Sequence, residues 1–209
     1  MANIKITELP SAGALAGTEL LELAQTGSSV SATAAAIGNS ATALPYLSLA
    51  GRAYGSFCDI TTSQTGSTTV ATAVRFNTNV MNSNGITMAV DGSSVANRLT
   101  FAVAGTYMIA PNLQFANSNA ADMDVTIWLA KSGTNIAYSA TKITVPKVGD
   151  GGTAFFQLVF YETVTAGQYI EILWLPENVS VTLAYTAANA GPPSIPAIPS
   201  AIVVAERIA

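Results

Sequence analysis

The sequence LTFAVAGTYMIAPNLQF at residues 99–115, the polar spacer ANSNAAD at 116–122 and MDVTIWLAK at 123–131 decide the fold class. Side chains alternate between the two faces of a strand. One face of the strand near residues 106–115 therefore carries Tyr107, Ile109 and Leu113, and the opposite face carries smaller or polar side chains. The first face is typical of a core, and the second requires an explanation.

The composition is unusually poor in charge. Of 209 residues, 50% are hydrophobic and 10% are charged, whereas a soluble domain usually has about a quarter charged residues. A chain of this length suits one domain with a core of its own plus a smaller part. We expect much of the surface to be covered by other chains; the alternative is a neutral, monomeric secreted domain.

Charge and cysteine content exclude several classes of function. The net charge is -4 and the eight basic residues are scattered, so we expect no nucleic-acid binding. Cys58 is the single cysteine, which excludes an intrachain disulfide. No apolar run approaches the roughly 18 residues of a membrane span, and residues 1–10 lack the apolar region of a signal peptide. We therefore expect no membrane partner and assembly in a cytoplasm.

The chain divides near Pro45. Residues 1–40 are predicted to form an arm with a hairpin around residues 26–29 and a short helix over 31–37 that ends at Gly38. Such a piece is too poor in large apolar residues for a core of its own, and an isolated hairpin is marginal in water. Residues 41–53 are predicted as a linker, and residues 54–209 as the main domain.

Short strands separated by turn signals fill the main domain. This pattern, without helical periodicity, favours an antiparallel sandwich or barrel. We predict strands at 54–60, 70–76, 86–90, 98–103, 106–115, 123–131, 136–144, 153–163, 168–175, 179–185 and 201–208.

The segment TAFFQLVFYE at 153–162 is apolar on both faces. Phe156, Leu158 and Phe160 share one face. The other face, with Phe155, Val159 and Tyr161, is interrupted only by Gln157. An outer sheet face normally meets water. Because this strand is apolar on its outer face as well, we expect another chain or segment to cover that face. Identical subunits would provide that cover, since obligate interfaces resemble a core cut in half; the N-terminal segment of the same chain is the alternative.

Two motifs resemble a known family. FAVAGTY at 101–107 and VTAGQYI at 164–170 are similar to the C1q/TNF-like jelly roll, a fold that forms trimers. Residues 115–131, TVPK at 144–147, PAIPS at 196–200 and the opening ITELPSAGALAGTELLELAQ are similar to tailed-phage head-fibre, decoration and tail-fibre proteins. The chain lacks a collagen stalk or a transmembrane anchor, which argues against receptor signalling.

The resemblance implies an all-β, antiparallel jelly-roll sandwich and a homotrimer. It places one face of each of two strands toward the threefold axis: Met108, Ala110, Asn112, Gln114, Phe155, Gln157, Val159 and Tyr161. It also implies that the arm anchors the protein to a particle through its apolar residues: Ile4, Ile6, Leu9, Leu15, Leu20, Leu21 and Leu23.

Catalytic chemistry has little support. The chain contains no histidine, which removes the commonest general base and transition-metal ligand. Asp122 and Asp124 are interpreted as a solvated strand end rather than a glycosidase pair. The segment 149–152 is interpreted as a turn, because it lacks the Lys and Ser/Thr of a phosphate loop; a Ca²⁺ ligand at Asp150 is the weaker alternative. We expect no enzyme activity, cofactor or metal.

Four further features have structural interpretations. Cys58 is expected to be a small buried apolar residue. Core or interface packing is favoured for Trp128 and Trp174 over stacking on carbohydrate. GPPSIPAIP at 191–199 is expected to be a rigid connector into the last strand rather than a ligand of a recognition domain.

Together these inferences predict a non-enzymatic phage virion protein. The expected role is a trimeric capsid decoration or cement protein on the virion surface, bound to the major capsid protein or another virion protein through its arm. The alternative is a short tail fibre or head fibre that binds a host-surface glycan. Three arms on one trimer would add avidity to individually modest contacts.

Overall fold

The computed structural model describes residues 20–25, 28–33 and 52–209. The chain divides into two units, residues 1–51 and 52–209. In the first, β1 (Leu20–Gln25) pairs antiparallel with β2 (Ser28–Thr33), which confirms the predicted hairpin. The predicted helix at 31–37 is wrong in its first part, because residues 31–33 extend β2; its remainder lies outside the described residues.

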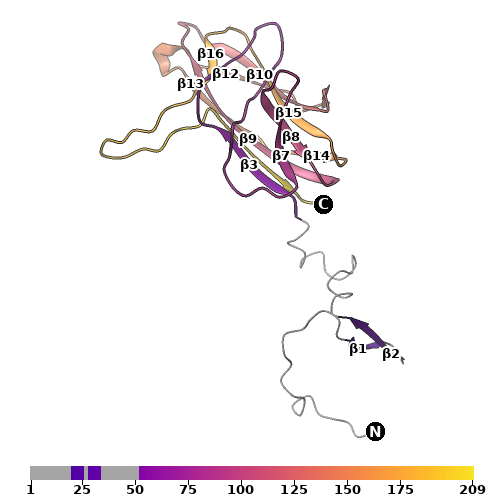
Figure 1. Cartoon of the computed structure of the whole chain (residues 1–209). Helices are drawn as coiled ribbons and strands as arrows, with labels where there is room; N and C mark the ends of the chain where they lie inside the picture. The colour runs from indigo at the N-terminus through magenta and orange to yellow at the C-terminus, as the bar shows by residue number, and fades with distance from the viewer. Residues whose placement is uncertain (1–19, 26–27, 34–51) are drawn as a thin grey trace. The chain divides into compact units, whose positions relative to one another are not determined.

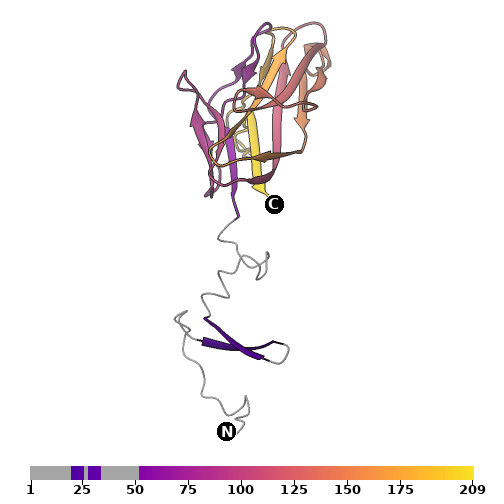
Figure 2. The same ribbon diagram turned by 90° about the vertical axis from the view of Figure 1, so that its right-hand side faces the viewer.

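Two antiparallel sheets form the second unit, and Figures 1 and 2 show them as facing layers. The larger sheet consists of β3 (Tyr54–Asp59), β4 (Gln64–Thr65), β6 (Thr78–Asn79), β9 (Gly105–Asn117), β13 (Thr153–Gln157), β14 (Phe160–Val164), β16 (Val181–Leu183) and β17 (Ala201–Arg207). The smaller sheet consists of β5 (Thr72–Ala73), β7 (Ile86–Val90), β8 (Ala96–Phe101), β10 (Met123–Lys131), β11 (Thr134–Asn135), β12 (Thr141–Val145) and β15 (Tyr169–Pro176).

Strand β9 organises the larger sheet. Strands β16 and β17 pair with β9, and so do β13 and β14. The amide of Gln114 donates to the carbonyl of Ser200 beside β17, whereas the amide of Asn117 donates to Gly152 beside β13. Successive amides of a strand point to opposite edges. Strands β16 and β17 therefore follow one edge of β9, and β13 and β14 follow the other.

The core lies between the sheets. The odd-numbered side chains of β9 from Tyr107 to Phe115 are buried. Phe115 meets Trp174 of the opposite sheet with ring centroids 5.7 Å apart, and Phe101 meets Tyr107 at 4.5 Å. Offset or tilted aromatic pairs of this kind add to the stabilisation from burial. This arrangement confirms the predicted all-β antiparallel jelly-roll sandwich.

Four predicted strands differ clearly from the observed ones, and the one at 179–185 shrinks to β16. The strand at 70–76 shrinks to β5, and the strand at 136–144 becomes β12 after a turn at 136–140. The strand at 153–163 divides into β13 and β14, leaving Leu158 and Val159 unpaired. The registers on either side place Leu158 opposite Pro111, whose missing N–H would point toward it.

Candidate interaction surface

The outward face of the larger sheet, away from the core, brings together all eight residues predicted to lie at a subunit contact. Cross-strand register pairs Phe155 with Gln114 and Gln157 with Asn112 in β13, and Tyr161 with Met108 in β14. Val159 lies between the two strands, opposite Ala110 in the same register. We call these eight residues the β9 face: Met108, Ala110, Asn112, Gln114, Phe155, Gln157, Val159 and Tyr161.

Large apolar side chains of the β9 face are open to solvent. Phe155 is 61% exposed, Val159 44% and Tyr161 64%, whereas the alternate residue Phe156 is 4% exposed. The sequence had indicated this contrast, since consecutive strand residues point to opposite sides. Contiguous apolar patches on a monomer are often sites of interaction. Nothing within residues 52–209 covers this one.

The same face continues onto β17, which the sequence analysis missed. Ile202 pairs with Asn112 and Val204 with Ala110, and both side chains are only partly buried. Their neighbours Ala201, Val203 and Ala205 are fully buried. Alternation along AIVVAER would have revealed that Ile202 and Val204 share a face. It could not reveal that this face adjoins Asn112, because that depends on strand pairing.

Asn112 lies in the middle of this surface with an unsatisfied oxygen. Its Oδ1 atom is buried and accepts no hydrogen bond from the described residues. A buried polar atom without a partner costs about 1–3 kcal/mol, and native structures contain few of them. The carboxamides of Gln114 and Gln157 beside it also form no hydrogen bond with the described residues.

The β9 face carries no charged residue. The nearest charge in register is Glu206 opposite Met108, and its carboxylate forms an ion pair with Arg52. An uncharged centre with aromatic residues is typical of protein interfaces, whose cores are depleted of charge. The arrangement therefore suits association with an apolar or amide-bearing surface.

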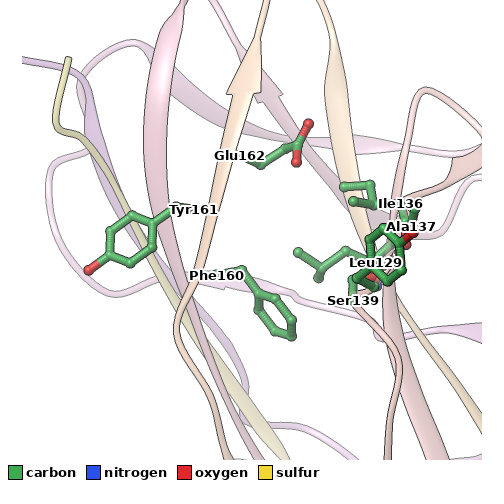
Figure 3. A pocket seen from close by; sticks show the side chains of 8 residues that line it. Leu129, Ile136, Ala137, Ser139, Phe160, Tyr161 and Glu162 are labelled. Carbon is green, nitrogen blue, oxygen red and sulfur yellow. Dashed lines mark hydrogen bonds between the residues drawn. The ribbon is translucent and has the colours of Figure 1, made fainter.

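Behind the edge strand β14 lies a pocket of about 140 Å³ (Figure 3). Phe160 points into it and Tyr161 points away toward the β9 face. The ammonium of Lys131 binds the Glu162 carboxylate at its rim with an N–O distance of 2.5 Å. The pocket is lined by Leu129, Ile136, Ala137, Tyr138, Ser139, Phe160, Tyr161 and Glu162. This lining contains no paired carboxylates and no nucleophile with an adjacent base.

The acidic candidates are held by structural contacts. Asp122 accepts a hydrogen bond from the Lys147 amide at 2.8 Å, and Asp124 accepts one from the Thr144 hydroxyl at 2.7 Å. That hydroxyl, with Lys142, lowers the pKa of Asp124. In residues 52–209, no three His, Cys, Asp or Glu side chains gather as a metal site would require.

The glycine-rich segment 149–152 is a turn, as predicted. The short 3-10 helix η3 (Val148–Asp150) leads into Gly151 and Gly152 with φ of 98° and 59°. The Asp150 carboxylate lies 3.6 Å from the Lys147 ammonium. A Cβ on Gly152 would lie 2.7 Å from the carbonyl oxygen of Asn117. Glycine at 152 therefore serves the close approach of two backbones.

Trp174 and Cys58 are buried as predicted, at 0% and 4% exposure. Burial raises the pKa of the Cys58 thiol, and the neighbouring Asp59 carboxylate raises it further. A buried thiol of this kind is unreactive. Trp128 is partly buried on the outer side of the smaller sheet, and its Nε1 donates to Asn135 at 2.8 Å.

The proline-rich segment is the returning half of a hairpin that projects from the body (Figure 1). Backbone hydrogen bonds join Thr186 with Ile198 and Asn189 with Ile195 at 2.9–3.0 Å. Ile195 and Ile198 are exposed. The segment leads directly into β17, as expected, but it runs antiparallel to its outgoing half rather than as a single extended path.

The predicted anchoring residues lie in the first unit. Leu20, Leu21 and Leu23 belong to β1. Ile4, Ile6, Leu9 and Leu15 lie outside the described residues. No helix in the described part of the chain is long and apolar enough to cross a membrane.

Comparison with known proteins gives a fold likeness alone. No family model matches the chain, and no curated protein matches it. Similar solved structures include murine APRIL at pH 5.0, with 10% identity and a TM-score of 0.45, and murine APRIL at pH 8.5, with 8% identity and a TM-score of 0.46. Each match covers 75% of this chain and 99% of the APRIL chain. The jelly-roll assignment rests on the sheet topology described above.

Proposed function

We propose that the protein is a non-enzymatic structural component of a bacteriophage virion that assembles as a homotrimer through the β9 face. The observation that supports self-association is the exposure of Phe155, Val159 and Tyr161 on one uncharged sheet face. A second copy offers the same apolar and amide groups. Burying such a patch against it gains roughly 25 cal/mol for each Å² of apolar surface.

Within this proposal the trimer is a capsid decoration or cement protein on the virion surface. Residues 1–40 dock on the major capsid protein or another virion protein. The support is the likeness of ITELPSAGALAGTELLELAQ to the opening of phage decoration and fibre proteins, together with the low charge of the chain. The absence of histidine from the sequence supports a role without catalysis.

Sedimentation of the full chain tests self-association. We expect a trimer at micromolar concentration, and a monomer when Phe155→Lys places an ammonium on the β9 face. The matched control is Val179→Lys, a residue 58% exposed in the turn before β16. The control adds the same charge and should remain trimeric. A monomeric wild type, or a trimeric Phe155→Lys variant, contradicts the proposal.

Attachment to particles requires a separate experiment. Removing residues 1–40 should leave a folded trimer that no longer binds virions. The three arms supply the contacts with the particle, and their combined avidity is lost with them. Particles stripped of the protein should lose resistance to heat or low salt. Undiminished binding of the shortened trimer would contradict the anchoring role.

The second candidate is a short tail fibre or head fibre that binds a host glycan. The projecting hairpin at 186–198 favours this alternative because it presents an exposed element to a ligand. Replacing residues 187–197 by a two-residue turn should then abolish adsorption to host cells and leave the stability of the shell unchanged. The decoration role acts through residues 1–40 and predicts that the same variant keeps both adsorption and the stability of the shell.

A further inference from the structure

The turn that follows β11 places an aromatic residue where glycine is usual. The Ser139 amide donates to the Ile136 carbonyl across this turn, and Tyr138, its third residue, has a φ of 63°. A type II turn needs a positive φ at that position and therefore favours glycine there. The Tyr138 side chain is 105% exposed, so no packing within residues 52–209 offsets the cost of the left-handed conformation. Outliers of this kind cluster at ligand sites.

Tyr138 lines the mouth of the pocket behind β14. Leu129, Ile136 and Phe160 give this pocket an apolar floor (Figure 3). Its volume of about 140 Å³ is close to that of an apolar cavity of about 150 Å³ that holds one benzene ring. The pocket therefore has room for a single six-membered ring.

Buried hydrogen bonds fix the wall of the pocket. The Ser139 hydroxyl accepts the Leu129 amide at 3.0 Å and donates to the Ile136 carbonyl at 2.8 Å. Ser139 is 5% exposed, so a buried contact ties the turn to β10. A wall that is ordered before binding loses little conformational freedom when a ligand enters.

The rim of the pocket offers a hydrogen-bond acceptor and a donor of opposite charge. Lys131 Nζ binds Glu162 Oε1 and donates to the Thr163 carbonyl at 3.0 Å. Neither Glu162 Oε2 nor the third N–H of Lys131 hydrogen-bonds to another residue in 52–209. The ion pair has no net charge to attract an ionic ligand. Neighbouring hydroxyl groups, by contrast, can donate to the carboxylate and accept from the ammonium.

We propose that Tyr138 and this pocket form a binding site for one pyranose ring of a carbohydrate. An apolar C–H face of the sugar packs on the Tyr138 ring, and its hydroxyls bind Glu162 and Lys131. A wholly apolar ring would remove water from these charged groups without replacing its hydrogen bonds. The site lies on the other side of β14 from Tyr161 and the β9 face, so binding does not require self-association. It also differs from the hairpin at 186–198.

NMR titration of the full chain with the methyl glycosides of glucose, galactose, mannose and N-acetylglucosamine tests this assignment. We expect at least one glycoside to shift the signals of the pocket residues. Tyr138→Gly and Glu162→Gln should each weaken that binding about tenfold or more, through loss of a packed ring and of a charged hydrogen bond. Tyr138→Gly should also keep or raise the melting temperature, because glycine adopts a positive φ without strain.

Ser132→Gly is the matched control. Ser132 also has a positive φ, of 49°, but does not line the pocket, so this variant should retain binding. Binding of none of the four glycosides, or equal binding by the wild type and Tyr138→Gly, overturns the proposal. Binding of phenol in place of any glycoside overturns it too, because the pocket would then take an aromatic ring. A lower melting temperature of Tyr138→Gly would assign the Tyr138 ring to folding and contradict its role at the site.

Discussion

Leu158 lies opposite Pro111, and at this point the backbone pairing between the edge strand and β9 is interrupted. The registers of β13 and β14 with β9 are continuous across the gap. The interruption therefore reflects a missing donor and not a bulge, since proline has no N–H. Leu158 is 38% exposed, although its position in the alternation belongs to the inner face.

Replacing Pro111 by valine should restore that donor. We expect the new amide at position 111 to exchange as slowly as the neighbouring amides of β9, because it gains the Leu158 carbonyl as acceptor. Stability should stay within about 1 kcal/mol, as a hydrogen bond of roughly that value offsets the lost rigidity of proline. Hydrogen exchange by mass spectrometry or NMR measures this. Exchange at the rate of an exposed amide would show that the gap has another cause.

Gly152→Ala should destabilise the domain by about 1–3 kcal/mol. The added Cβ would lie 2.7 Å from the Asn117 carbonyl oxygen, and the backbone is held at a φ of 59°. Gly149→Ala is the control within the same turn, since its Cβ would meet nothing within 4 Å. Urea denaturation compares the two variants. Equal losses of stability would contradict the steric argument.

The buried carboxylate of Asp59 depends on Arg75. Asp59 is 0% exposed, and its Oδ2 accepts the Nε–H of Arg75 at 2.8 Å. Arg75→Met should cost about 1–3 kcal/mol, the range for a buried polar group that loses a partner, because the Arg75 side chain itself is 36% exposed. The loss is limited because Asn77, Gln64 and Thr61 still donate to the carboxylate.

Urea denaturation of Arg75→Met and of the double variant Arg75→Met/Asp59→Asn checks this dependence. The double variant should recover part of the loss, because no uncompensated charge remains. A loss of stability that Asp59→Asn does not reduce would place the effect in packing rather than in charge.

Asp91 should make stability depend on pH in the acid range. The amide of Val95, then the Asn97 side chain and the Ser93 amide, hydrogen-bond to this carboxylate and lower its pKa from 3.8. Because the folded pKa lies below the unfolded one, the contribution is fully present above about pH 4 and is lost as the pH falls through the folded value.

The Asp91→Asn variant tests this assignment. Its melting temperature should be lower than that of the wild type at pH 7, because the new NH₂ group faces the Asn97 donor, 2.8 Å from Asp91 Oδ2. The difference should shrink as the pH is lowered from 4 to 2.5. A constant difference across that range would contradict a role for ionised Asp91.

Alternation along LTFAVAGTYMIAPNLQF and TAFFQLVFYE predicted which side chains leave the core, except for Leu158, which is 38% exposed. It correctly placed Met108, Asn112 and Gln114 on one side of β9 and Phe155 and Tyr161 on one side of the edge strands. The division of residues 153–163 into two strands was missed because its cause, Pro111, lies more than 40 residues earlier. The extension of the surface through Ile202 and Val204 was missed for the same kind of reason.

The sequence by itself determined the all-β class, the strands of the core and the face to which each strand residue belongs. These properties depend on local periodicity, which each segment carries independently of the others. Only the tertiary structure decided that β13, β14 and β17 flank β9, that Arg75 covers Asp59 and that Asn112 Oδ1 is buried without a partner. Those relationships join residues far apart in the chain, and pairing between strands arises from the packing of the whole sandwich.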